Sequence, residues 1–156
     1  MSEARAVAVV QDGGRLLVSE QHEPQVKGMA LTFLGGYPKP GETMEQCLGR
    51  VVKEHVGLLL NIVRPLYVVE SFWRQGGQDH QEVGVYFLCR IKGGVETDPE
   101  GNVHARDPKT HVRLLDAEMI DAQRLYPPFL RKELLRDYRG GFKEGIKHFV
   151  DDLRPK

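Results

Sequence analysis

The sequence predicts a mixed α+β domain in which strands flank one central helix and a second helix follows near the C-terminus. Apolar, β-branched runs lie on both sides of a stretch with helical periodicity, residues 44–55. A Pro-Pro pair precedes a second helical stretch at residues 129–138. Strands, a helix, more strands and a helix in this order are typical of α+β proteins. A chain of 156 residues is long enough for one domain, residues 1–156, with its own core.

The first segment predicts a hairpin followed by a short strand. Residues 5–11 and 15–20 are rich in aliphatic side chains, and Asp12-Gly13-Gly14 between them is a turn signal. Residues 21–29 contain Pro and Gly and predict a loop. Residues 30–34 then predict a short strand that leads into the next loop.

The middle segment predicts a loop and a helix. Glycine and proline punctuate residues 35–41. Thr43 and Gln46 have the spacing of a capping box, which places the start of the helix there. Apolar residues recur at helical spacing up to His55, and Gly57 lies where a glycine commonly ends a helix.

The second half predicts further strands and the closing helix. Strands are expected at residues 58–63, 66–74, 82–91 and 111–115, with Pro65 interrupting the first two and a turn at 75–79. The run 82–91 is apolar enough for the centre of a sheet, and the polar stretch 93–106 predicts an exposed excursion. Pro128 is expected near the first turn of the helix. In the C-terminal helix and tail, 127–156, Gly140-Gly141 ends the helix and residues 142–153 predict a short amphipathic helix.

Composition narrows the class of partner. Lys plus Arg and Asp plus Glu both number 22, so no basic field exists for a nucleic acid polymer. No apolar run approaches the roughly 18 residues that a membrane span requires, and no signal-peptide pattern is present. Cys47 and Cys89 are expected to be reduced, buried thiols. These observations predict a soluble cytoplasmic protein that acts on a small molecule.

The loop and helix at residues 35–58 resemble the motif of the Nudix (MutT-like) family. Seven of its nine specified positions match in register: Gly36, Glu42, Arg50, Val52, Glu54, Gly57 and Leu58. A specified residue matches by chance roughly one time in fifteen, so this agreement is specific. The motif expects Glu at the two other positions, which are Val51 and His55 here. The stretches 69–73 and 80–87 also look like segments of that family.

The resemblance implies a fold, a reaction and a metal. The fold is an α/β/α sandwich around a mixed β-sheet, and family members are often homodimers. The reaction is attack of water on a phosphorus atom of a nucleoside diphosphate linked to another moiety. A divalent cation, Mg²⁺ or Mn²⁺, would neutralise the phosphate oxygens and acidify the water. Zn²⁺ becomes an alternative if His55 is a ligand.

The resemblance also assigns roles to individual residues. Metal ligands would be Glu54, His55, Glu82 and the backbone carbonyl of Gly35, and catalysis would involve Glu54, Glu82 and Arg50. Gly36, Glu42 and Gly57 would form the scaffold of the motif, with Glu42 and Arg50 holding the loop on the helix. Each has a simpler reading: Glu54 as a solvated helix residue, His55 as a packed, hydrogen-bonded residue, and Glu82 as a charge at a strand end. Val51 can neither ligate a metal nor accept a proton, and its aliphatic neighbours predict a core position.

Two functions therefore remain open. The first is a Nudix-family hydrolase whose activity is impaired or altered because two motif carboxylates are missing. The second is a non-hydrolytic nucleotide-binding or regulatory domain that keeps the fold and its cleft. Both need cations for phosphate groups, and the candidates are Arg5, Arg15, Lys27, Arg74 and Arg90.

Overall fold

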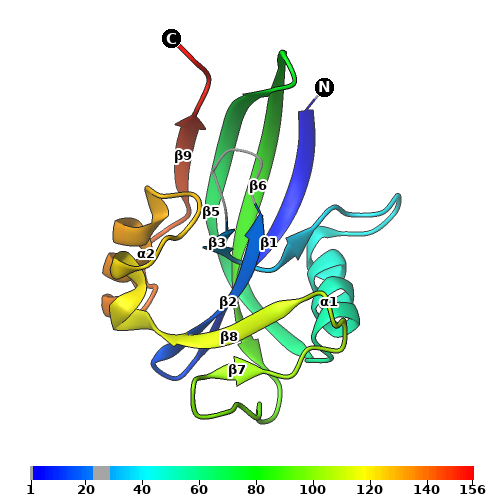
Figure 1. The fold of residues 1–156 in the computed structure, drawn as a ribbon, viewed down its shortest axis with the longest axis vertical. Helices are drawn as coiled ribbons and strands as arrows, with labels where there is room; N and C mark the ends of the chain where they lie inside the picture. Colours follow the sequence, from blue (N-terminus) through cyan, green and yellow to red (C-terminus); the bar gives the residue numbers. More distant parts are fainter. Residues whose placement is uncertain (1, 23–28) are drawn as a thin grey trace.

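A mixed β-sheet forms the centre of the computed structural model, which describes residues 2–22 and 29–156 (Figure 1). Along the main path of the sheet the strand order is β7-β8-β2-β1-β6-β5-β9, while β3 pairs with β2 and β4 pairs with β1. The elements are β1 (Ser2–Asp12), β2 (Arg15–His22), β3 (Met29–Thr32), β4 (Gly35–Gly36), α1 (Met44–His55), β5 (Leu60–Gln75), β6 (Gln78–Ile91), β7 (Asn102–Val103), β8 (His111–Asp116), the 3₁₀ helix η1 (Ala117–Ala122), α2 (Leu130–Arg139) and β9 (Lys147–Asp152).

Helices cover both faces of this sheet, which confirms the predicted α/β/α sandwich. Helix α1 lies on one side of the strands, and η1 with α2 lies on the other (Figure 1). Two separate apolar cores result. The core under α1 contains Val52 and Phe87, and the core under α2 contains Tyr86 and Leu134. Phe87 and Tyr86 are neighbours on β6, because successive side chains of a strand point to opposite faces.

The prediction that residues 82–91 lie at the sheet centre is confirmed. Strand β6 runs parallel to β1 and antiparallel to β5, with ladder partners along both of its edges. The predicted hairpin forms only at its turn. Just two residue pairs, Gln11 with Leu16 and Asp12 with Arg15, join β1 to β2. Beyond the turn the strands separate, β1 continuing along β6 and β2 along β8.

The predicted break at Pro65 is wrong. Strand β5 runs from Leu60 through Pro65 to Gln75 without ending. Register irregularities fall between Ile62 and Arg64 and between Pro65 and Tyr67. Proline has no N–H for the ladder, and an irregular register is a position where a strand tolerates it.

The predicted helix in residues 142–153 is also wrong, because this segment contains strand β9 parallel to β5. Its exposure alternates residue by residue, which is the period of a strand. Phe149 contributes by packing its ring against Tyr67 and Phe129, at centroid distances of 5.6 and 5.0 Å. An isolated amphipathic stretch does not reveal that a sheet edge is available to pair with it.

Smaller boundaries differ as well. The strand expected at 30–34 ends at Thr32, and the polar stretch 93–106 contains the short strand β7. Helix α2 has Phe129 as its N-cap, so Pro128 precedes the cap instead of occupying the first turn. The loop expected at 21–29 lies largely outside the described residues.

Both cysteines are free and buried, as predicted. No helix within residues 2–22 and 29–156 is long and apolar enough to cross a membrane.

The loop–helix segment agrees closely with its prediction. Thr43 caps α1 through the amide N–H of Gln46, and the Gln46 side chain accepts from the Thr43 amide. Gly57 follows the C-cap with φ of +80° and donates its N–H to Val52 and Lys53 carbonyls. Only glycine adopts this left-handed conformation without steric cost, so Gly57 ends the helix as predicted.

Candidate functional site

Two glycines bring the motif loop into direct contact with the sheet and the helix. Gly35 and Gly36 form β4 and pair with Val7 and Ala6 of β1. A Cβ atom at Gly35 would lie 2.5 Å from the Ala6 carbonyl oxygen, and one at Gly36 would lie 2.7 Å from Cγ2 of Val51. The motif therefore needs glycine here because the backbone approaches its neighbours too closely for any side chain.

Gly36→Ala should consequently lower the free energy of unfolding by about 1–3 kcal/mol, the usual cost of overpacking. Val51 cannot easily move away, because β-branched residues are restricted at χ1 in helices. Adding Val51→Ala should recover most of this cost, and a double-mutant cycle by urea denaturation measures the coupling. Gly49→Ala is the control, since no atom lies within 4 Å of its added Cβ and α1 should become slightly more stable. Equal effects of both alanines would contradict the contact.

The predicted pairing of Glu42 with Arg50 is present and ties the loop to α1. Arg50 donates from Nε to one Glu42 oxygen at 2.8 Å and from a terminal nitrogen to the other at 2.9 Å. The Lys39 amide also donates to Glu42, at 3.0 Å. Glu54 lies 3.6 Å from Arg50 on the outer side of the helix, with 57% of its side chain exposed. The bidentate geometry accounts for the motif's choice of Arg over Lys.

The pairing with Arg50 lowers the pKa of the Glu42 carboxyl group. The hydrogen bonds from Arg50 and from the Lys39 amide lower the pKa of Glu42 from 4.5 to about 2. Because the folded-state pKa is the lower one, the carboxylate stabilises the fold above its unfolded pKa and this contribution is lost as the pH falls toward 2. Carboxyl ¹³C NMR should find Glu42 titrating near pH 2. The Arg50→Gln variant should return its pKa toward that of an ordinary glutamate, and an unshifted wild-type carboxyl would contradict the pairing.

A polar cleft of about 310 Å³ lies between α1 and the strands. Gly35 and Val51 line one part, and the last residue of α1, His55, lines another. Nδ1 of His55 is 3.3 Å from Oδ2 of Asp107 and 3.4 Å from the Thr110 hydroxyl. The remaining lining residues are Ser19, Glu20, Gln21, Leu34 and Lys109.

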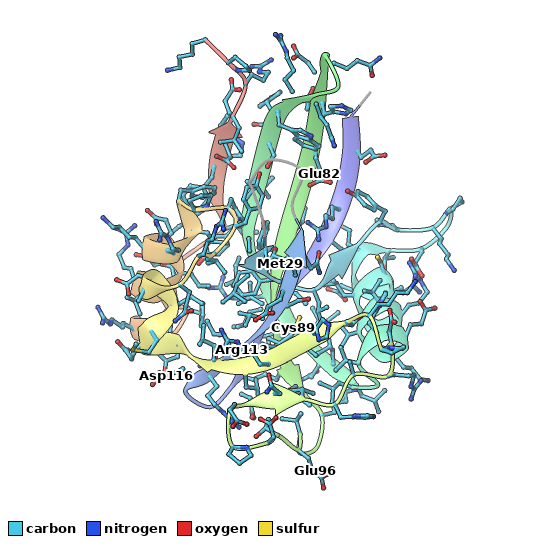
Figure 2. All side chains as sticks on the ribbon, viewed as in Figure 1. Met29, Glu82, Cys89, Glu96, Arg113 and Asp116 are labelled. Carbon is cyan, nitrogen blue, oxygen red and sulfur yellow. The ribbon has the colours of Figure 1, made fainter. Side chains whose placement is uncertain are left out.

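Glu82 is not part of this cleft. Its carboxylate accepts a hydrogen bond from the Tyr37 hydroxyl. By strand alternation Glu82 shares a face with Tyr86, in the core under α2, whereas Phe87 faces α1. Figure 2 shows Glu82 on the upper part of β6, well above the position of α1 in that view. Burial and the Glu82 carboxylate raise the pKa of the Tyr37 hydroxyl well above its usual range, so this hydroxyl stays a donor.

The predicted metal ligands therefore do not assemble. Within the described ranges 2–22 and 29–156, no three His, Cys, Asp or Glu residues are grouped so that they could hold a metal ion. Glu54 lies beside Arg50, His55 beside Asp107, and Glu82 beside Tyr37. Val51, at the position of the first missing Glu, is 5% exposed. As they are placed, these residues do not gather into a site built from several carboxylates, and their roles as metal ligands stay predictions.

Most candidate phosphate partners are also engaged elsewhere. Arg15 pairs with Asp12, Arg74 with Asp79, and Arg90 donates to Gln11. Lys27 lies outside the described residues. Arg5 differs, because its Nε would lie 3.3 Å from a Cβ atom at Gly35 and its guanidinium forms no ion pair with any described residue. The cleft residue Lys109 is exposed and was missed by the sequence analysis.

The sequence analysis also missed the cleft residues Asp107 and Thr110, and one reason explains these two residues and Lys109. They lie in a polar stretch that contains only turn signals, and no spacing connects it to α1. The structure makes the connection through the Asp107 amide, which donates to the His55 carbonyl at 3.0 Å. An Asp followed by Pro and a nearby Thr could have predicted the turn itself, but not the element on which it packs.

Solved structures of Nudix hydrolases share this fold. A Nudix hydrolase from Nitrosomonas europaea superposes with a TM-score of 0.68 at 13% identity, over 96% of this chain and 78% of that one. A UDP-X diphosphatase superposes with a TM-score of 0.65 at 14% identity, over 97% and 68%. At these identities the likeness concerns the fold alone.

Sequence comparison defines the family. The NUDIX domain profile matches residues 1–132, and the chain therefore belongs to the NUDIX domain family. The NAD-capped RNA hydrolase NudC of Stutzerimonas stutzeri is 34% identical over 67 residues. That match covers 43% of this chain but only 23% of the length of NudC. Nudix hydrolases act on nucleotide-linked substrates and generally use divalent metals.

Proposed function

We propose that this chain binds a nucleoside diphosphate linked to another moiety and hydrolyses its phosphoric anhydride much more slowly than a Nudix domain with all motif carboxylates. Family membership, with the intact loop–helix scaffold around Gly36, Glu42 and Gly57, supports the binding. The observation that carries the reduced rate is the buried Val51, because general-base catalysis typically contributes about 10²–10⁴ to a rate.

The cleft beside Gly35 is the proposed position of the phosphates. It is polar, it is open to solvent at His55, and Lys109 lines it. Arg5 approaches Gly35 from the face opposite to the one on which Val51 contacts Gly36, so the positive charge proposed for the cleft comes from Lys109. Neutralising a pyrophosphate by such a side chain is weaker than neutralising it by a bound cation, which again supports slow turnover.

A second candidate is a nucleotide-binding or regulatory domain without hydrolysis. The absence of a three-ligand cluster from the described residues favours it, because one or two isolated carboxylates cannot assemble a metal site. The two candidates make the same prediction for binding and differ only in product formation.

One experiment separates them. Product release would be measured from ADP-ribose, a UDP-sugar and NAD, with Mg²⁺, Mn²⁺ or Zn²⁺ in separate reactions and EDTA in another. Thermal stabilisation by each ligand would be measured in parallel, since a ligand stabilises by RT ln(1 + [L]/Kd). Slow product release above that of a Glu54→Gln preparation supports the hydrolase. Thermal stabilisation without product under every condition supports the binding domain. If neither product nor thermal stabilisation is observed, both candidate functions are contradicted.

The preferred ion, a homodimeric state and a cytoplasmic location stay predictions. The metal comparison above tests the ion, with Zn²⁺ preference expected only if His55 is a ligand. Sedimentation equilibrium tests the oligomeric state, and fractionation of cells tests the location.

A further inference from the structure

One wall of the cleft is built from uncharged side chains of β2. Ser19 and Gln21 both line the cleft, and being two residues apart on a strand they point to the same face of the sheet. That face is the one under α1, because Leu17 belongs to the core under α1 and Val18 to the core under α2. By the same alternation Glu20, which also lines the cleft, turns its carboxylate to the other face.

Gln21 is held in place by its own strand. Its Nε2 donates to the Ser19 hydroxyl at 3.2 Å, and Ser19 is only 1% exposed. Strand β2 is paired along both edges here, with Ser19 opposite Thr32 of β3 and Val112 of β8. The second N–H of Gln21 and its Oε1 form no hydrogen bond with any residue that the structure describes. The amide therefore presents one donor and one acceptor to a ligand from a rigid wall.

The other groups of the cleft are suited to phosphates or already engaged. Lys109 is the cation proposed for the phosphates. The Asp107 carboxylate accepts from the Lys109 amide at 3.0 Å and from the Thr110 hydroxyl at 3.2 Å. No Phe, Tyr or Trp is among the described residues that line the cleft. A flat aromatic group, such as a nucleobase or a nicotinamide ring, therefore finds no such ring on which to stack.

The size of the cleft and its hydrogen-bonding groups point to one class of moiety. A volume of about 310 Å³ is at the lower end of ligand pockets, which span roughly 300–1,000 Å³, so the cleft suits a diphosphate with one small ring. A hydroxyl group both donates and accepts, which matches the two remaining positions of the Gln21 amide. A small, uncharged ring with several hydroxyls is a sugar.

We propose that the moiety beyond the diphosphate is a terminal sugar and that Gln21 is the specificity-determining residue that binds its hydroxyls. Ser19 is the residue that positions the Gln21 amide. This proposal rests on the proposed function, because it takes the phosphates to lie beside Gly35 and Lys109. A nucleoside diphosphate sugar should consequently bind more tightly than NAD, whose additional nicotinamide ring has neither room nor a stacking partner in the cleft.

The test measures binding to the full chain by isothermal titration calorimetry, with Mg²⁺ and in EDTA. The ligands are UDP-glucose, UDP, which lacks the sugar, and NAD. Gln21→Leu should weaken the binding of UDP-glucose about 10-fold, the effect of one or two uncharged hydrogen bonds, and leave the Kd of UDP unchanged. Ser19→Ala should weaken UDP-glucose by a smaller factor. Gln78→Leu, at an exposed glutamine that begins β6, is the matched control and should change neither Kd.

The outcomes separate this proposal from the proposed function. An unchanged Kd of UDP-glucose in Gln21→Leu, in a sample whose thermal unfolding shows that it is folded, would overturn the role of Gln21. Equal weakening of UDP and UDP-glucose would overturn it too, because the residue would then contact phosphates or support the fold. Wild-type protein that binds NAD as tightly as UDP-glucose would overturn the terminal sugar, and this comparison needs no variant. In these cases UDP binding leaves the phosphate site intact. If the wild type binds neither UDP nor UDP-glucose, the proposed function is overturned, and the sugar site with it.

Discussion

Val51→Glu is expected to raise the rate of product release by about 100-fold or more, because it returns the motif's missing carboxylate to the helix. Val51 lines the cleft beside Gly35, so a longer side chain at this position can extend toward bound phosphates. The gain should depend on a divalent cation and disappear in EDTA. The measurement is steady-state product release from the same panel of nucleoside diphosphate derivatives.

Val51→Gln is the matched control, because it has nearly the same size and lacks the charge. Both variants should lose about 1–3 kcal/mol of stability, since each places a polar group at a nearly buried position. Only the glutamate variant should gain rate. A glutamate variant that is folded but no faster than the glutamine variant would show that the cleft does not hold the phosphates as proposed.

Asp137→Ala is expected to lower the free energy of unfolding by about 2–3 kcal/mol, because hydrogen bonds to a charged group contribute about 1.5–3 kcal/mol and Lys147 keeps Glu144 as a partner. Its carboxylate accepts from the Tyr67 hydroxyl at 2.6 Å and from Lys147 Nζ at 2.6 Å. The side chain of Asp137 is only 6% exposed. This one carboxylate therefore joins α2 to β9, the next element of the chain, and to β5, which is distant in sequence.

Urea denaturation at pH 7 measures the effect, and Asp121→Asn, at an exposed position of η1, is the control. Burial alone would raise the pKa of Asp137, but the bonds from Lys147 and Tyr67 outweigh burial and lower it. The stabilisation is therefore complete above the unfolded pKa of about 3.9 and is lost as the pH falls below it. In the Asp137→Ala variant, this part of the decrease in stability at low pH should be absent. A loss no larger than that of the control would show that the pair contributes little.

Local signals in the sequence were sufficient wherever a structure depends on near neighbours. The capping box of Thr43 and Gln46, the left-handed Gly57 and the apolar run of β6 all follow from spacing and residue type. Elements that depend on distant partners were predicted incorrectly. Strand β9 exists because the edge of β5 is available, and β5 continues past Pro65 because irregular register accommodates the ring.

The sequence by itself determined the family and the sandwich of helices around a mixed sheet, and it predicted that two motif carboxylates are missing. It could do so because the motif is a contiguous segment in which each residue acts on neighbours a few positions away. Only the tertiary structure decided which candidates meet. It separates Glu54 from Glu82 because strand alternation turns Glu82 to the face opposite α1, and it brings Asp107 to His55 through a turn that packs against the end of the helix. Such juxtapositions depend on how elements pack across the sheet, a property that no single segment of the sequence carries.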